Sequence, residues 1–152
     1  MNETVSDNSE ELCFEDFRFE EFRNALEDLI ESRKTVKPKN RTEYAGSVAL
    51  FRICFDTCIQ ALGYMIGEVV SPTPKKIIKH AYDAGIISSH EKWRSWREMY
   101  NYRNDAAFYT NISLAESILK RVDEEFIDLF REFEQYVSER HEHEESSAEN
   151  IT

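Results

Sequence analysis

The feature that most constrains the fold is a set of apolar residues between positions 41 and 68 that recur three or four residues apart. The set is Tyr44, Val48, Phe51, Phe55, Cys58, Leu62 and Met65. This spacing places them on one face of a helix of about seven turns, which is too long and too apolar for a surface helix. We therefore expect a core helix from about Arg41 to Glu68, with Asn40 as its N-cap and Glu43 as the capping partner.

The same spacing predicts four further helices, at about 14–34, from Pro74 to near Gly85, at about 91–103 and at about 113–137. Proline is tolerated in a first helical turn and glycine favours a helix C-terminus, so the second of these is short. Together they predict an all-α chain, a four-helix up-and-down bundle with a short inserted cross-helix.

The starts of the last two helices carry capping signals. Ser88 or Ser89 is expected to cap the helix at 91–103, with Glu91 in the capping-box position to Ser88. Ser113 and Glu116 have the spacing of a capping box for the final helix.

The composition supports one helical domain, because a chain with only 4 Gly and 3 Pro has few residues for the turns of an all-β protein. We place the domain at 13–138, between disordered acidic ends at 1–12 and 139–152. The N-terminal sequence has no signal-peptide pattern and no apolar run reaches the roughly 20 residues of a membrane span, so we expect a cytoplasmic protein.

The negative charge is concentrated in the two ends of the chain. The net charge is -11, yet residues 33–103 contain 13 Lys or Arg against 6 Asp or Glu. A nucleotide, a phosphate group or an acidic partner is therefore compatible with this part of the chain, although a solvated surface explains the same pattern.

No metal site or cofactor is predicted. Cys54 and Cys58 lie four apart within the apolar helix and are expected to be buried thiols, as is Cys13. His141 and His143 lie in the acidic tail, where we expect them to be solvated. The common glycine-rich, Walker and H-E-x-x-H motifs are absent from the sequence.

The segment from Ser71 to Ile87, followed by Trp93 and Met99 and then by Arg103-Asn104, carries a resemblance. It is similar to the patterns P-x-x-x-I-x-x-A-x-x-x-G-x-I and W-x-x-M-x-x-x-R-N-x-x-x-H of the HEPN superfamily, in its nucleotidyltransferase substrate-binding branch. The resemblance covers about residues 14–137. Its specificity lies in the order and spacing of the motifs.

The resemblance implies a helical homodimer that works beside a minimal nucleotidyltransferase, often as a toxin–antitoxin-like pair. Ribonuclease members of the superfamily use the Arg and His of R-x-x-x-x-H, but Phe108 stands here at the histidine position. A phenyl ring cannot transfer a proton as imidazole can, so the motif is degenerate for catalysis. Some members have a modifiable Tyr two residues after the His, where this chain has Thr110, with Tyr109 one residue earlier.

The candidate binding residues are Arg103, Asn104, Trp93 and Tyr109. Arg103 and Asn104 could hold a phosphate group, or Arg103 could pair with Asp105, with Glu98 or with backbone carbonyls. The rings of Trp93 and Trp96 could stack on a base or could only pack in the bundle.

Two surfaces could bind partners. Lys75, Lys76 and Lys79 form a basic face on the short helix that could attract nucleic acid or an acidic protein, or could simply be solvated. The surplus of aromatic residues could contribute to a dimer interface, at Phe51, Phe55, Tyr64, Phe126, Phe130 and Phe133.

Three hypotheses follow. The first is a non-catalytic nucleotide- or substrate-binding partner of a minimal nucleotidyltransferase. The second is a metal-independent ribonuclease that uses Arg103 with a histidine outside the motif, such as His80 or His90, on RNA. The third is a structural interaction module without a ligand.

Overall fold

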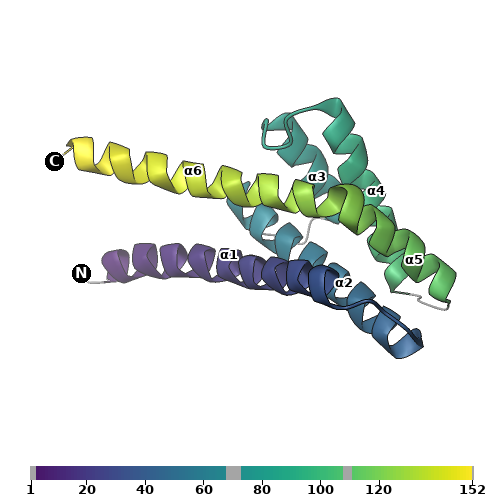
Figure 1. Ribbon diagram of the computed structural model, residues 1–152. Helices are drawn as coiled ribbons and strands as arrows, with labels where there is room; N and C mark the ends of the chain where they lie inside the picture. Colours follow the sequence, from purple (N-terminus) through teal and green to yellow (C-terminus); the bar gives the residue numbers. More distant parts are fainter. Residues whose placement is uncertain (1–2, 68–72, 108–110, 152) are drawn as a thin grey trace.

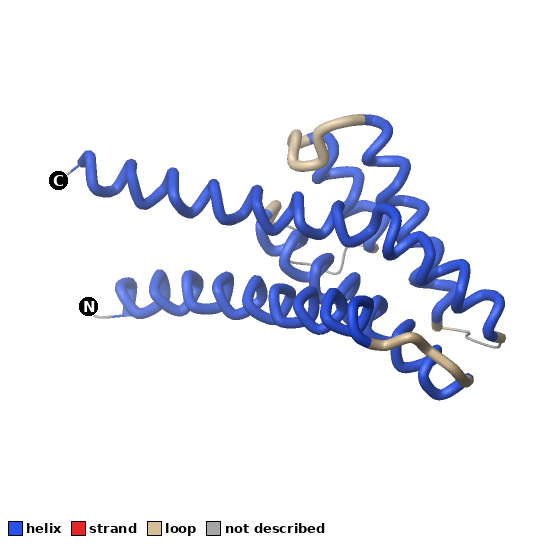
Figure 2. The backbone as a smooth tube through the Cα atoms, in the orientation of Figure 1, coloured by secondary structure: helices blue, strands red, loops and turns tan. Residues whose placement is uncertain are grey.

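The computed structural model describes the backbone of residues 3–67, 73–107 and 111–151 and the side chains within 17–140 of those ranges. Every regular element in them is helical, which confirms the all-α prediction (Figure 2). The elements are α1 (Glu3–Thr35), α2 (Arg41–Met65), α3 (Pro74–Asp83), α4 (His90–Ala106), α5 (Ile112–Arg121), η1 (Val122–Phe126) and α6 (Ile127–Ile151).

Helix α2 is the centre of the arrangement, since it contacts α1, α3, α4 and α5. A five-residue connection joins α1 to α2, and the two helices pack side by side in opposite directions (Figure 1). The short helix α3 lies beside α4 and also contacts α2 (Figure 1). The long helix expected at 113–137 is present as a continuous rod made of α5, η1 and α6.

The rod contains a feature that the sequence did not predict. Residues Val122–Phe126 form a π-helical turn between α5 and α6. Val122 and Phe126 of this turn are fully buried, while Asp123 and Glu124 are exposed. Turns of this kind interrupt the regular spacing of an α-helix and are frequent at functional sites.

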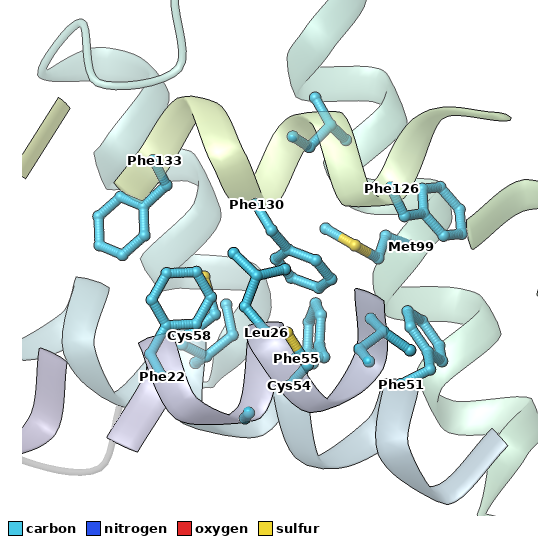
Figure 3. Close-up of a cluster of buried hydrophobic side chains, with 14 of the residues drawn as sticks. Phe22, Leu26, Phe51, Cys54, Phe55, Cys58, Met99, Phe126, Phe130 and Phe133 are labelled. Atoms are coloured by element: carbon cyan, nitrogen blue, oxygen red, sulfur yellow. The ribbon is translucent and has the colours of Figure 1, made fainter. Parts of the chain in front are cut away.

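Phenylalanine side chains from three helices form the centre of the core (Figure 3). Phe22 of α1 lies with its ring centroid 5.5 Å from that of Phe133 and 6.0 Å from that of Phe130, both on α6. Phe51 of α2 stacks on Phe126 at 5.9 Å. The prediction that part of the aromatic surplus lies in a dimer interface is therefore wrong for five residues that are buried within one chain, Phe51, Phe55, Phe126, Phe130 and Phe133.

Two of the three helix caps predicted from the sequence agree with the structure, those of α2 and α4. Asn40 Oδ1 accepts from the backbone N–H of Glu43 at 3.0 Å, and Ser89 Oγ accepts from that of Lys92 at 3.1 Å. With Ser89 as the cap, Lys92 occupies the third position, so the predicted pairing of Glu91 with Ser88 is wrong.

The remaining prediction, a capping box from Ser113 to Glu116, is also wrong. Asn111 caps α5 instead, because its Oδ1 accepts from Leu114 N–H at 2.7 Å and starts the helix two residues earlier. The Glu116 carboxylate accepts a hydrogen bond from the hydroxyl of Tyr44 on α2 at 3.2 Å.

Gly85 ends α3 as predicted. Its φ of +81° lies in the left-handed region that glycine adopts most readily. The N–H groups of Gly85 and Ile86 donate to the carbonyls of Tyr82 and Ala81, at 3.1 and 2.9 Å. This pattern is a Schellman motif, which satisfies carbonyls at the helix end.

Two helices are longer than the sequence predicted, because α1 begins at Glu3 and α6 continues to Ile151. The acidic ends thus lie side by side at one end of the molecule (Figure 1). The expectation of disordered ends and a domain at 13–138 stays a prediction. Helix α2 is long and apolar enough to cross a membrane, but half of its most apolar window is buried inside the bundle, as in a core helix.

Candidate functional site

Helix α4 carries the candidate site, and its two ends have different surroundings. Its first turns pack against α3, and its last turns pack against α2. Trp93 and Arg103 lie ten residues apart, which separates them by roughly 15 Å along the helix axis. The structure therefore does not bring these two predicted binding residues into one small site.

Arg103 is held by a residue of α2 that is 47 positions away in the sequence. Its Nε and Nη2 donate to Oδ1 and Oδ2 of Asp56 at 2.8 and 3.0 Å. The hydrogen bonds that Arg103 donates to Asp56 raise the pKa of Arg103, and burial opposes that rise. Arg103 is thus a fixed cation with Nε and Nη2 bound to Asp56, while Nη1 makes no hydrogen bond within the described residues.

A hollow of about 250 Å³ lies beside this ion pair, between α2 and the end of α4. Its lining is mostly small and apolar, with a single charged side chain, and consists of Ala45, Val48, Ala49, Arg52, Ala106 and Ala107. Arg52 is half-buried and has no ion-pair partner among the residues that the structure describes. The hollow therefore combines space for a small group with an uncompensated cation, next to the Arg103–Asp56 pair.

Asn104 follows Arg103 and is partly exposed. Its backbone carbonyl accepts from the N–H of Ala107 at 3.2 Å and so helps to end α4. Its side-chain amide makes no hydrogen bond within the described part of the chain. The amide is thus available as both donor and acceptor.

Trp93 belongs to an aromatic cluster at the start of α4. Its ring stacks on Tyr82 of α3 with centroids 5.7 Å apart, and the His90 ring lies at 5.2 Å. The guanidinium carbon of Arg97 lies 5.0 Å from the Trp93 ring centroid. The other tryptophan, Trp96, packs edge to face against Phe130 in the core.

The predicted residues that follow α4 lie outside the described part of the chain. These are Phe108, Tyr109 and Thr110, so their relation to Arg103 stays a prediction. His90 is thirteen residues from Arg103, roughly 20 Å along the same helix, and contacts Tyr82 and Trp93. Residues Lys75, Lys76 and Lys79 are exposed on α3.

Glu98 does not pair with Arg103, as one alternative had it, but with Arg121 beside the π-helical turn. Arg121 Nε and Nη2 donate to the two Glu98 carboxylate oxygens at 2.7 and 3.0 Å, and Nη2 also contacts Glu125. A hydrogen bond from Ser95 and the contact with Arg121 lower the pKa of Glu125, and burial opposes them. The nearby groove of about 440 Å³ is lined by α4 residues such as Arg94, Ser95 and Asn101.

Cys54 and Cys58 are buried, as predicted, and desolvation raises the pKa of both thiols. They are therefore uncharged and unreactive members of the core. Within the described residues, no three metal-ligating side chains lie close enough together to hold a metal ion.

Sequence reasoning missed Asp56 and Arg52. A signal was present, because they are the only charged residues between Tyr44 and Met65. Their four-residue spacing places them close together on the helix. Two charges in an otherwise uncharged core helix indicate a partner, but the sequence could not say that the partner of Asp56 is Arg103.

The family model described as "Nucleotidyltransferase substrate binding protein like" matches residues 17–139. This range covers α2, α3, α4 and α5 and most of the rest of the bundle. The chain belongs to this family, which is consistent with the resemblance to the HEPN superfamily. Among curated proteins no match to the chain was found.

Proposed function

We propose that this protein is a non-catalytic nucleotide- or substrate-binding partner of a minimal nucleotidyltransferase, in a cytoplasmic, toxin–antitoxin-like pair. The observation that carries the proposal is the hollow between α2 and the end of α4, lined by Arg52, which has no ion-pair partner among the described residues. Ala106, which also lines the hollow, lies three residues after Arg103. Membership of a family named for nucleotidyltransferase substrate binding supports the same reading.

The chemistry of the hollow suits a phosphate group. Arginine binds phosphate through a planar fork of N–H donors, and apolar walls strengthen that attraction by excluding water. Asp56 occupies two donors of the Arg103 fork, so an anion that binds there would replace the aspartate. The side-chain amide of Asn104 would add a hydrogen-bond donor for the ligand, and Tyr109, which follows α4 in the sequence, would be a further binding residue.

The absence of a motif histidine supports a binding role over a catalytic one. Phe108 has no group that can take up or release a proton near neutral pH. The ribonuclease hypothesis would need another imidazole, and His90 is held in the aromatic cluster at the far end of α4. The site would hold its ligand for the partner enzyme.

A homodimer is part of the proposal, and the outer face of α2 is the surface we favour for it. Ile53 is 47% exposed there, and Gly46, Leu50 and Thr57 share its side of the helix. An exposed apolar side chain on an uncharged helix face is typical of an interface. Because the hollow opens on the same helix, a dimer would bring two hollows together.

The test is calorimetric titration of ATP into the purified protein, beside co-purification of the protein with a minimal nucleotidyltransferase from the same cells. Arg103→Ala and Arg52→Gln should each weaken ATP binding by roughly tenfold. The control is Arg33→Ala, which removes a similar two-bond ion pair between Arg33 and Asp123, neither of which lines the hollow, and should leave ATP binding unchanged. The proposal of a non-catalytic protein would be overturned if the unaltered protein cleaved RNA without a metal ion and Arg103→Ala abolished that cleavage.

A further inference from the structure

A second surface, separate from the hollow, lies where α3 meets the start of α4. Its centre is the stack of Tyr82 on Trp93, with centroids 5.7 Å apart and an interplanar angle of 29°. Both rings are half-buried, so each presents part of its surface to solvent. His90 lies against both rings, at 6.3 Å from Tyr82 and 5.2 Å from Trp93.

Cations surround the two rings. The Arg97 guanidinium lies over Trp93 at 5.0 Å and is exposed. On α3, Lys75 and Lys79 precede Tyr82 by seven and three residues, which places them on the same side of the helix. Neither lysine has an ion-pair partner within the described residues.

The acidic side chains on these helices only partly offset this charge. Glu98 is engaged by Arg121, and Asp56 of α2 by Arg103. Asp83 and Glu91 are exposed acids of α3 and α4 near the surface, against Lys75, Lys76, Lys79, Arg94 and Arg97. The local excess is thus positive, in a protein whose net charge is -11.

We propose that this surface, made of Lys75, Lys79, Tyr82, His90, Trp93 and Arg97, binds single-stranded nucleic acid. Exposed rings beside cations match the two parts of a nucleotide, since rings and guanidinium planes stack on bases and lysines contact phosphates. An acidic protein segment would use the cations but has no planar groups for the rings. The site goes beyond the proposed nucleotide hollow and does not depend on it.

The experiment measures binding of labelled poly(U) and poly(dT) by fluorescence anisotropy at several salt concentrations, with duplex RNA as a comparison. The double variant K75E/K79E should weaken single-strand binding at least tenfold at low salt and flatten the salt dependence. The control variant K37E/K39E makes the same charge change in the α1–α2 connection, where both lysines are exposed, and should have a smaller effect.

Trp93→Ala should weaken binding by about tenfold through loss of stacking, and Trp93→Phe should restore part of it. Poly(U) should also quench the fluorescence of the unaltered protein but not of Trp93→Phe, because Trp96 is only 3% exposed. Equal effects of K75E/K79E and K37E/K39E would overturn the proposal. So would unchanged binding by Trp93→Ala together with no quenching of the unaltered protein by poly(U), or binding of labelled polyglutamate that poly(U) does not displace. Loss of ATP binding in Arg103→Ala with poly(U) binding retained would separate the two sites.

Discussion

The phenylalanine core and the polar end of α4 are held together by different kinds of contact. In the core, residues at helical spacing such as Phe22, Phe130 and Phe133 meet in apolar contact and exclude solvent. At the end of α4, Arg103 is held by two directed hydrogen bonds to a single carboxylate and stays 27% exposed. The core therefore provides stability and the polar end provides a group that can exchange partners.

The same contrast appears at the π-helical turn. Phe126 of that turn is buried in the core, while Asp123 accepts two hydrogen bonds from Arg33 of α1 at 2.8 and 2.9 Å. Arg121, just before it, binds Glu98 of α4. Directed ion pairs thus join α1 and α4 to the rod at this turn.

The largest effect is expected in the core. Phe130→Ala should lower the free energy of unfolding by about 3–5 kcal/mol, because the ring is fully buried against Phe22 and Trp96. Urea denaturation followed by circular dichroism measures the change. The control Phe17→Ala, at a side chain that is 58% exposed, should change it by less than about 1 kcal/mol. Equal losses in both variants would contradict the assigned core.

A smaller effect is expected for the ion pairs. Arg121→Met should cost about 1–2 kcal/mol, because Glu98 and Glu125 lose a charged donor but remain partly hydrated. Arg131→Met on the same rod is the control, since Arg131 is exposed and has no ion pair within the described residues. If the two variants have the same free energy of unfolding, the ion pairs of Arg121 with Glu98 and Glu125 do not hold α4 to the rod.

The smallest effect is expected on the loss of stability at acidic pH. The pKa of Glu125 is lowered in the folded state, so its charged form is favoured there. Its contribution to stability is present above the unfolded-state pKa of about 4.3 and is lost as pH falls through the folded pKa. The thermal midpoint should therefore fall less on acidification in Glu125→Gln than in the unaltered protein. Asp128→Asn, at an exposed position of the same rod, should leave the acid dependence unchanged.

Much of the fold could be predicted from the sequence because local spacing determines it. The apolar residues of α2, the cap at Asn40 and the turn at Gly85 all depend on neighbours within a few positions. The π-helical turn could not be predicted, because it depends on Asp123 and Arg121 meeting partners 90 and 23 residues away. The cap at Asn111 was missed because Ser113 and Glu116 offered a competing local pattern.

The candidate site was only partly predictable for the same reason. Arg103 and Asn104 were found through the family pattern, but no local rule relates them to Asp56 and Arg52 on α2. The separation of Trp93 from Arg103 follows from helix geometry once both lie on one continuous α4. The sequence thus pointed to one helix, and the tertiary contacts place the two ends of that helix in different surroundings.

The central claim, that the end of α4 holds a phosphate group, is tested most directly by Asp56→Asn. This change removes the charge that engages the fork of Arg103 while keeping the size of the side chain. Calorimetric titration of ATP should then give a Kd roughly tenfold lower than that of the unaltered protein, since the phosphate no longer competes with a carboxylate. Unchanged or weaker ATP binding by Asp56→Asn would contradict the account and assign the Arg103–Asp56 pair a purely structural role.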